Sequence, residues 1–306
     1  MADFFDTSVD VLLGYRIRDN RIDTALERIV DYCRTYDPEA VSEAEKVLAK
    51  YPHSFKAVYS CASVILVYGS REHDPKLLRR SLELLEQSRT LLSQNDDPRI
   101  SEATITGNLS LAWFLLGERS RSIDLLRKNN AGGMHSGSIG AMLSVYEDAP
   151  EEAAPFLSEA LLSAASSLLT AVFGYVFLYR SRNDWQSAID IICWATDILT
   201  GLKAEKGTDA MDMTLAEILI LKAYVQQKTG DRAGSSQSLE KARTTALRFD
   251  SAPDYSLGTM RFAEQMDQSL AFDILGSTAA ESIENLIGLL GDADLADMWE
   301  EAERYE

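Results

Sequence analysis

Three tight turns, each placed between two apolar helical segments, constrain the fold of this chain most strongly. The first turn is at Gly117, the second at Asn183 and Asp184, and the third at Gly230 and Asp231. Glycine and asparagine tolerate the positive φ with which a chain leaves a helix, and aspartate caps the helix that follows. Each turn therefore predicts two antiparallel helices in direct contact.

Small residues follow each turn at helical spacing, where the backbones of paired helices must approach closely. They are Ser122 after the first turn, Ala188 and Ala195 after the second, and Ser235 and Ala242 after the third. Elsewhere apolar residues recur every three or four positions, and the alternation typical of strands is almost absent. We therefore predict an all-α chain.

This pattern of turns and small residues resembles the tetratricopeptide repeat, an antiparallel helix pair whose copies stack into a superhelix. The resemblance implies a right-handed superhelix of antiparallel helix pairs, a tetratricopeptide-like α-solenoid, over residues 21–250. The three turns are unevenly spaced, and Val176 occupies a position where the family has a small residue. The subclass of helical repeat therefore stays open.

The N-terminus carries a second resemblance, in residues 2–5 (ADFF), 8–10 (SVD) and 12–14 (LLG). This pattern is similar to the last helices of the XRE-type (lambda-repressor-like) helix-turn-helix domain. The resemblance implies that residues 1–20 are the end of a DNA-binding domain and a connector, with the recognition helix before Met1. The alternative is an ordinary short helix, capped by Ser8 and stopped by Gly14.

The charge of the chain bears on its partners. Its net charge is −18, with a pI near 4.6. Because contacts with phosphates dominate affinity for nucleic acid, so acidic a chain is expected to repel DNA. Any DNA binding would come from an N-terminal domain absent from this chain. The same charge favours a basic or neutral ligand.

Cysteine usage and hydropathy favour a cytoplasmic protein. Cys33, Cys61 and Cys193 lie in apolar helical contexts, which predicts reduced core thiols and no disulfide framework. No secretory signal opens the sequence, and we expect no membrane span. Residues 161–179 come closest to one, but their serines and helical spacing predict a buried helix.

Few residues form a pattern that indicates chemistry. His53, His73 and His135 lie far apart, without partners at metal-ligand spacing, and no hydrolase, zinc-protease or dinucleotide motif occurs. The glycine-rich residues 131–137 lack the ending of a phosphate loop and predict a flexible turn. We therefore expect no enzyme, no cofactor and no metal.

Binding is the remaining class of function, because a curved stack of helix pairs presents a concave groove. Aromatic and amide side chains on the first helices of pairs are the candidates for its lining: Tyr68, Asn108, Trp113, Tyr175, Tyr179 and Gln226. Regulators that resemble this architecture hold a short peptide in such a groove, and Asn108 is of the type that bonds a peptide backbone.

Residues 251–306 differ in character from the repeats and end in an acidic helix. Terminal repeats of solenoids need a polar cap, so this segment is either a cap or a dimerisation segment. The candidates for a dimer surface are Phe272, Ile274, Leu286, Leu290 and Trp299. The XRE resemblance implies a homodimer, because such regulators bind paired half-sites.

Three functions follow. The first is the sensor and dimerisation region of a bacterial transcription regulator that binds a peptide or small molecule. The second is a standalone helical-repeat adaptor for protein–protein interaction. The third, an all-helical enzyme, needs a clustered acid–base pair, which the sequence does not show.

Overall fold

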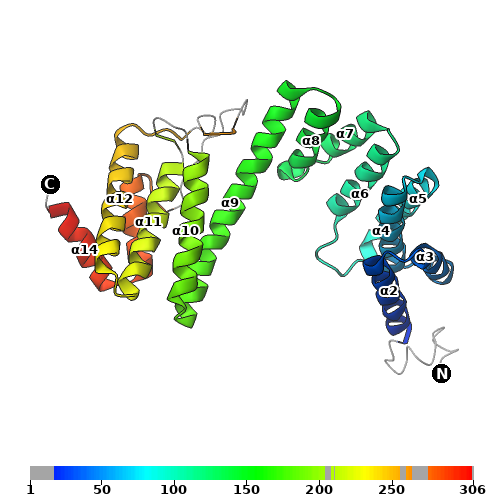
Figure 1. Cartoon of the computed structure of the whole chain (residues 1–306), viewed down its shortest axis with the longest axis horizontal. Coiled ribbons are helices and arrows are strands. Elements are labelled where there is room, and N and C mark those ends of the chain that lie inside the picture. Colours follow the sequence, from blue (N-terminus) through cyan, green and yellow to red (C-terminus); the bar gives the residue numbers. More distant parts are fainter. Residues whose placement is uncertain (1–16, 204–207, 210, 256–259, 264–274, 305–306) are drawn as a thin grey trace. The chain divides into compact units, whose positions relative to one another are not determined.

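The computed structural model describes residues 17–203, 208–209, 211–255, 260–263 and 275–304 (Figure 1). Within these ranges it contains thirteen α-helices, two short 3₁₀ helices and no strand. The predicted all-α class is therefore confirmed. The chain forms two compact units, one ending at His135 and the other beginning at Ser136. This division falls inside the segment assigned above to helical repeats.

From residue 17 onward, unit 1 contains six α-helices and two 3₁₀ helices. They are α2 (Ile17–Thr35), α3 (Glu39–Lys50), α4 (Phe55–Glu72), α5 (Pro75–Thr90), η2 (Leu92–Gln94), α6 (Glu102–Leu115), α7 (Arg119–Lys128) and η3 (Ala131–Gly133). Each α-helix packs against the next one along the chain, and α4 also contacts α2 and α6. The core of the unit centres on α4, where Cys61 and Ile65 are fully buried.

The ends of these helices follow local chemistry. Asp74 is the N-cap of α5 and accepts a hydrogen bond from the Lys76 backbone N–H at 2.7 Å, and Pro75 is the first residue of the helix. Glycine often ends a helix, but α4 continues past Gly69 to Glu72. Gly69 instead permits close packing, since a Cβ there would lie 3.0 Å from the backbone nitrogen of Leu78. The connector expected within residues 1–20 is partly helical, because α2 begins at Ile17.

The described part of unit 2 contains seven α-helices. They are α8 (Ser136–Tyr146), α9 (Pro150–Arg182), α10 (Trp185–Leu202), α11 (Met211–Lys228), α12 (Arg232–Ser251), α13 (Ala279–Leu290) and α14 (Ala293–Arg304). Consecutive helices again pack on one another from α8 to α12, and α13 packs on both α11 and α12.

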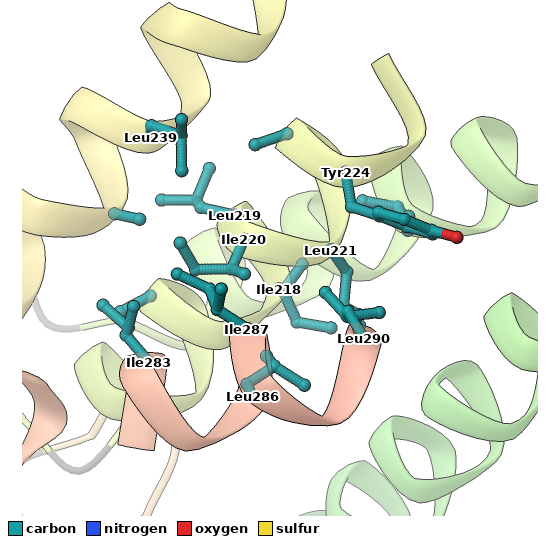
Figure 2. Packing of buried hydrophobic residues seen from close by; sticks show 14 of the residues in the cluster. Ile218, Leu219, Ile220, Leu221, Tyr224, Leu239, Ile283, Leu286, Ile287 and Leu290 are labelled. Atoms are coloured by element: carbon teal, nitrogen blue, oxygen red, sulfur yellow. The ribbon is translucent and has the colours of Figure 1, made fainter. Parts of the chain in front are cut away.

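The core of unit 2 is built around α11, which is buried on most of its circumference. Ile218, Ile220 and Leu221 of this helix are all fully buried. Figure 2 shows them beside the apolar face of α13, with Ile287 close to Ile220. A helix that is apolar nearly all round must be covered on several sides, and α10, α12 and α13 provide that cover.

All three predicted turns are present. Gly117, Asn183 and Gly230 adopt φ values of 85°, 55° and 84°, in the left-handed region that glycine and asparagine favour. The small residues after the turns are fully buried, with Ser122 and Ser235 among them. The turn chemistry thus predicted three helix pairs correctly: α6 with α7, α9 with α10, and α11 with α12.

In the C-terminal segment, residues 260–263 form a bend and a turn. Helix α13 follows, with Thr278 as N-cap and Gly291 at φ 62° after its end. Residues 1–16, which carry the XRE resemblance, lie outside the described residues.

The helix α9 is unusually long, at 33 residues. Figure 1 shows α8 beside its N-terminal end and α10 beside its C-terminal half. It is long and apolar enough to cross a bilayer by length and composition alone, which is weak evidence for a membrane protein. Only 28% of its most apolar window is buried. The predicted burial of residues 161–179 is therefore wrong for most of the helix surface.

Candidate functional site

A groove in unit 2 lies over α11, between α10 and α12, with a volume of ≈ 390 Å³. Most of its lining residues are of polar type, and they come from all three helices: Thr196 and Thr200 of α10, Leu215, Leu219, Lys222 and Gln226 of α11, and Gln237, Ser238, Glu240, Lys241, Thr244 and Thr245 of α12. The floor thus comes from the first helix of a pair, as expected for a groove in stacked pairs. The walls come from second helices, which was not expected.

Helical spacing brings these side chains to one surface. The floor residues Leu215, Leu219, Lys222 and Gln226 follow one another at intervals of four, three and four, which is one stripe of α11. Behind this stripe, the fully buried Ile218 and Leu221 anchor α11 in the core. The groove floor is therefore held by the most deeply buried helix of the unit.

Two lysines give the groove a local excess of positive charge. Lys222 is half-buried, Lys241 is exposed, and neither makes an ion pair or hydrogen bond within the described structure. Glu240 is the one acidic residue of the lining. An unpaired, partly buried ammonium group is a ready partner for a carboxylate or a carbonyl oxygen.

The threonine hydroxyls complement the lysines. Thr196, Thr200 and Thr244 each donate to the carbonyl one turn earlier in their own helix, at 2.8, 2.7 and 2.9 Å. Because each proton is committed to the helix, the oxygen lone pairs remain for a donor in the groove. The walls therefore accept hydrogen bonds and the lysines donate them, as the amides and carboxylate of a peptide require.

One end of the groove is fixed by a capping network. The Gln226 amide nitrogen donates to Asp231 Oδ2 at 3.1 Å, and its oxygen accepts from Ser238 Oγ at 2.6 Å. Asp231 in turn caps α12 by accepting from the Gly234 N–H at 2.9 Å. Gln226, a predicted groove residue, therefore lines the groove with its amide already bonded.

The other predicted groove residues do not gather around this groove. Tyr68 is 1% exposed and donates to the Asp37 carbonyl at 2.6 Å, so it belongs to the core of unit 1. Asn108 is half-buried and donates to the Tyr59 hydroxyl at 3.3 Å. Trp113 has the Arg121 guanidinium 3.5 Å from its ring centroid. Sequence reasoning could not foresee these partners, because they lie on other helices or, for Asp37, in the loop between α2 and α3.

Two further candidates lie on α9. Tyr175 is 44% exposed, and its ring stacks on that of Tyr179 with centroids 5.7 Å apart. Neither residue is part of the groove lining. The lysines and threonines that do line it were missed. Their sequence signal was the stripe of α11, which continues from leucine into Lys222 and Gln226 at unchanged spacing.

The predicted dimer residues fall into two groups. Phe272 and Ile274 lie outside the described residues. Leu286, Leu290 and Trp299 are 0%, 1% and 6% exposed and pack in the core of unit 2. They present no surface to a second chain, because the apolar faces of α13 and α14 cover α11 and α12.

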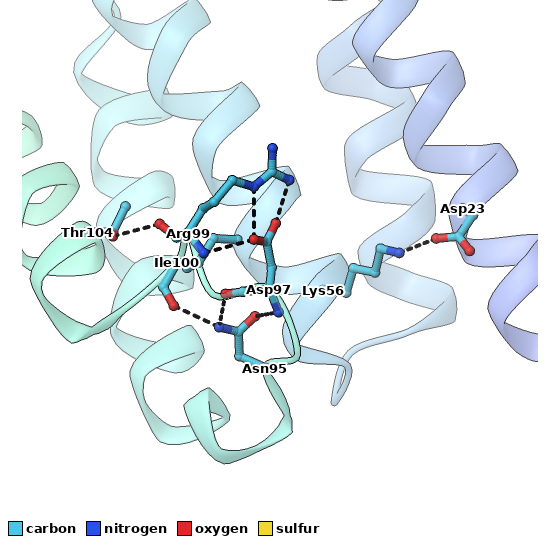
Figure 3. A network of polar contacts seen from close by, with 7 residues as sticks. All are labelled: Asp23, Lys56, Asn95, Asp97, Arg99, Ile100 and Thr104. Carbon is cyan, nitrogen blue, oxygen red and sulfur yellow. Dashed lines mark hydrogen bonds and ion pairs between the residues drawn. The ribbon is translucent and has the colours of Figure 1, made fainter. Parts of the chain in front are cut away.

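A polar loop in unit 1 holds the carboxylate with a strongly lowered pKa. Asp97 accepts both side-chain and backbone hydrogen bonds from Arg99, which lower its pKa to about 2 (Figure 3). The Asn95 amide donates to the carbonyls of Asp97 and Ile100, both at 2.8 Å. These bonds order the exposed loop before α6.

Groups of three or more histidine, cysteine or acidic side chains that could hold a metal ion do not occur among the residues that the structure describes.

Comparisons with known proteins give little further guidance. No protein-family model matches the sequence, and no curated protein matches it. Among solved structures, the chain is similar to BtubC (BKLC) from P. vanneervenii, with 16% sequence identity and a TM-score of 0.31. The match covers 81% of this chain and 98% of that one. A TM-score this low carries no argument about fold or function.

Proposed function

We propose that this chain is a ligand-sensing region that binds a short peptide, or a small molecule bearing a carboxylate, in the groove between α10, α11 and α12. The observation that carries the proposal is the unpaired, half-buried Lys222 on the floor of that groove. A cation placed there, with threonine oxygens on the walls, provides the donors and acceptors that a peptide terminus needs.

The architecture we propose is a tetratricopeptide-like α-solenoid, a right-handed superhelix of helix pairs. Sequential packing of the helices within each unit supports it, as do the contacts of α4 with both α2 and α6. In stacked pairs, every other helix meets its counterpart in the next pair, and extended binding surfaces result.

The ligand we propose is acidic at the point of contact, although the net charge of −18 favoured a basic or neutral one. Two lysines and one glutamate line the groove, so its local charge is positive. Charges farther away than about 8 Å are largely screened at physiological ionic strength, so the local groups decide which ligand end binds.

The biological setting we propose is an XRE-type transcription regulator, of which this chain is the sensor. The N-terminal resemblance in residues 2–14 supports this setting, and the DNA-binding domain would be encoded upstream. A ligand controls DNA binding there only if it binds one arrangement of two regulator chains more tightly than another.

The groove is tested by methyl NMR with a defined probe. A pool of pentapeptides with free C-terminal carboxylates should shift the methyl signals of Leu215 and Leu219, whereas the same pool with amidated C-termini should not. Lys222→Met should abolish the shifts, and the exposed control Lys76→Met should retain them. Equal shifts from both pools, or no shift from either, would contradict the proposed ligand chemistry.

The regulator setting has a separate test. The coding frame is extended upstream of Met1, and the longer protein is tested by gel shift on DNA from its own promoter region, with and without peptide. Peptide-dependent DNA binding supports the regulator. A protein that binds the peptides but no DNA is instead a helical-repeat adaptor.

A further inference from the structure

A largely exposed apolar stripe runs along α9 with the spacing of a coiled coil. Its members follow one another at intervals of three, four, three, four and three: Leu161, Ala164, Leu168, Ala171, Tyr175 and Leu178. We call these six residues the α9 seam. Alternating intervals of three and four keep a stripe facing a single partner helix over several turns.

The seam is separate from the face that α9 buries in its own unit. The buried face consists of Ala165, Leu169, Val172 and Val176, each one position after a seam residue. One position is about 100° around a helix, so the two faces point in different directions. On the seam, Leu161, Tyr175 and Leu178 remain 37%, 44% and 37% exposed.

The neighbouring helix α8 covers this side of α9 only before the seam begins. A Cβ on Gly140 would meet the side chain of Leu157 at 2.6 Å, and one on Gly137 would lie 3.5 Å from Ala160. Because α8 starts at Ser136, it ends opposite Ala160. From Leu161 onward the seam residues are exposed except Leu168, which packs partly against the core of the unit.

We propose that the α9 seam is the interface between two copies of this chain, which pair with their α9 helices antiparallel. Residues 160–179 contain no charged side chain, although the chain carries a net charge of −18. Two acidic chains can therefore approach along this stretch without like charges in contact. A single stripe paired with itself about a two-fold axis is the commonest form of homodimer contact.

The antiparallel direction follows from α8. In a parallel pair the N-terminal turns of both α9 helices would lie side by side, where α8 already packs against Leu157. In an antiparallel pair the partner's seam ends near Ala160 and leaves α8 in place. The direction also brings the acidic N-terminal turn, with Glu151 and Glu152, toward the end that carries Arg182.

Side-chain size fits this arrangement as well. The seam alternates large and small residues through its centre, from Leu161 to Ala171. When the helices run in opposite directions, Leu168 of one copy can face Ala171 of the other, and Ala164 can face Tyr175. Large side chains placed opposite small ones are what close helix packing requires.

A lipid partner is less consistent with the geometry. A helix that crosses a bilayer alone faces lipid on all sides, whereas α9 packs Leu169, Val172 and Val176 against α10. The inference does not rest on the proposed ligand or on the XRE resemblance, since it uses no groove residue and none of residues 1–16.

The test uses the whole chain in sedimentation velocity across a dilution series. The wild-type chain should sediment as a dimer at micromolar concentration, and Ala171→Glu should weaken the dimer at least about tenfold, because it places a carboxylate in an apolar interface. The matched control is Ser166→Glu, an exposed position on the opposite side of α9, which should leave the dimer intact. Circular dichroism should show equal helix content in all three.

Orientation is tested by the distance between spin labels at Arg182→Cys, with Cys33 and Cys193 replaced by Ser. An antiparallel pair places the two labels about 40 Å apart, from 1.5 Å per residue along each helix. A parallel pair places them within about 15 Å of each other, close to the spacing of packed helices, and would overturn the proposal.

Three other outcomes overturn it. A wild-type monomer at every concentration means that another part of the same chain covers the seam. If the dimer persists in Ala171→Glu, its interface is on another surface of the chain. Flotation of the wild-type chain with phosphatidylcholine vesicles, lost in Ala171→Glu and retained in Ser166→Glu, shows that lipid covers the seam.

Discussion

The hydroxyl of Ser122 donates to the backbone carbonyl of Ser110 at 2.8 Å, and the two hydroxyl oxygens lie 2.7 Å apart. These two buried serines join α6 to α7 where the helices approach most closely. The α11–α12 pair repeats the device, since Ser235 Oγ donates to the Ala223 carbonyl at 2.9 Å. The small serine side chains after the turns therefore allow the two helices to pack closely, and their hydroxyls also form hydrogen bonds between the helices.

Enlarging Ser122 should separate α6 from α7. We expect Ser122→Leu to lower the free energy of unfolding by about 1–3 kcal/mol, because a larger side chain does not fit a fully packed contact. Ser122→Ala should cost about 1 kcal/mol through the lost hydrogen bond. Urea denaturation measures both. The exposed neighbour Ser120→Leu is the control, and an equal loss there would refute the close-packing argument.

Cys61 should be inert in the folded chain. Burial, with a smaller effect of Glu45, raises the pKa of its thiol to about 12. At pH 8 about one such thiol in ten thousand is ionised, and only the thiolate is nucleophilic. Ellman's reagent should therefore titrate Cys33 and Cys193 in the native chain and all three thiols in urea. Cys61→Ser should give two thiols in both conditions; a third fast native thiol would count against the assigned burial.

The ion pair of Lys228 with Asp292 should make stability depend on acid pH. Burial raises the pKa of Asp292, but the Lys228 ammonium and the Leu295 N–H outweigh it, and the pKa is lowered. The contribution to stability is present above the unfolded pKa of about 3.9 and disappears as pH falls through the folded pKa.

Asp292→Asn should accordingly be less stable than the wild-type chain by about 1–3 kcal/mol at pH 6.5, and the difference should shrink toward pH 3. Urea denaturation at both pH values measures it. A difference that is the same at both pH values would mean that the carboxylate charge is not involved.

His135 should make the chain less stable as pH falls below neutrality. The side chain is 9% exposed, its Nε2 has no hydrogen-bond partner among the residues that the structure describes, and burial lowers the pKa of its imidazole. Folding therefore favours the neutral ring, and stability declines as pH drops from the unfolded pKa of about 6.5 through the folded one. His135→Gln should have a flatter profile of urea midpoint against pH between 7 and 5. The exposed control His53→Gln should follow the wild-type profile.

Local chemistry explains which parts of the fold could be predicted. Positive φ at Gly117, Asn183 and Gly230 and the cap at Asp74 depend on residues within one turn of the chain. These local features can therefore be recognised from the sequence alone. It also displayed the division between α8 and α9 at Pro150, because proline favours the first turn of a helix.

Burial depended on partners distant in the sequence. Tyr68 was predicted to line a groove, but in the structure its hydroxyl donates a hydrogen bond to the carbonyl of Asp37, 31 positions earlier in the chain. Leu286 and Leu290 were predicted to form a dimer surface, but in the structure they are buried against α11. An apolar side chain has the same local signature whether it faces its own core or a partner, so periodicity alone could not separate these cases.

The sequence by itself determined the helical class, the pairing of helices around three turns, and the three-and-four spacing of the α9 seam. Only the tertiary structure decided that α10 covers one apolar face of α9 and leaves the seam open. Only the tertiary structure brought Lys222 and Lys241 to one groove, from two helices that a tight turn folds together. Helix formation and turns are set by neighbours in the chain, whereas exposure and the sharing of a site are set by how whole helices pack.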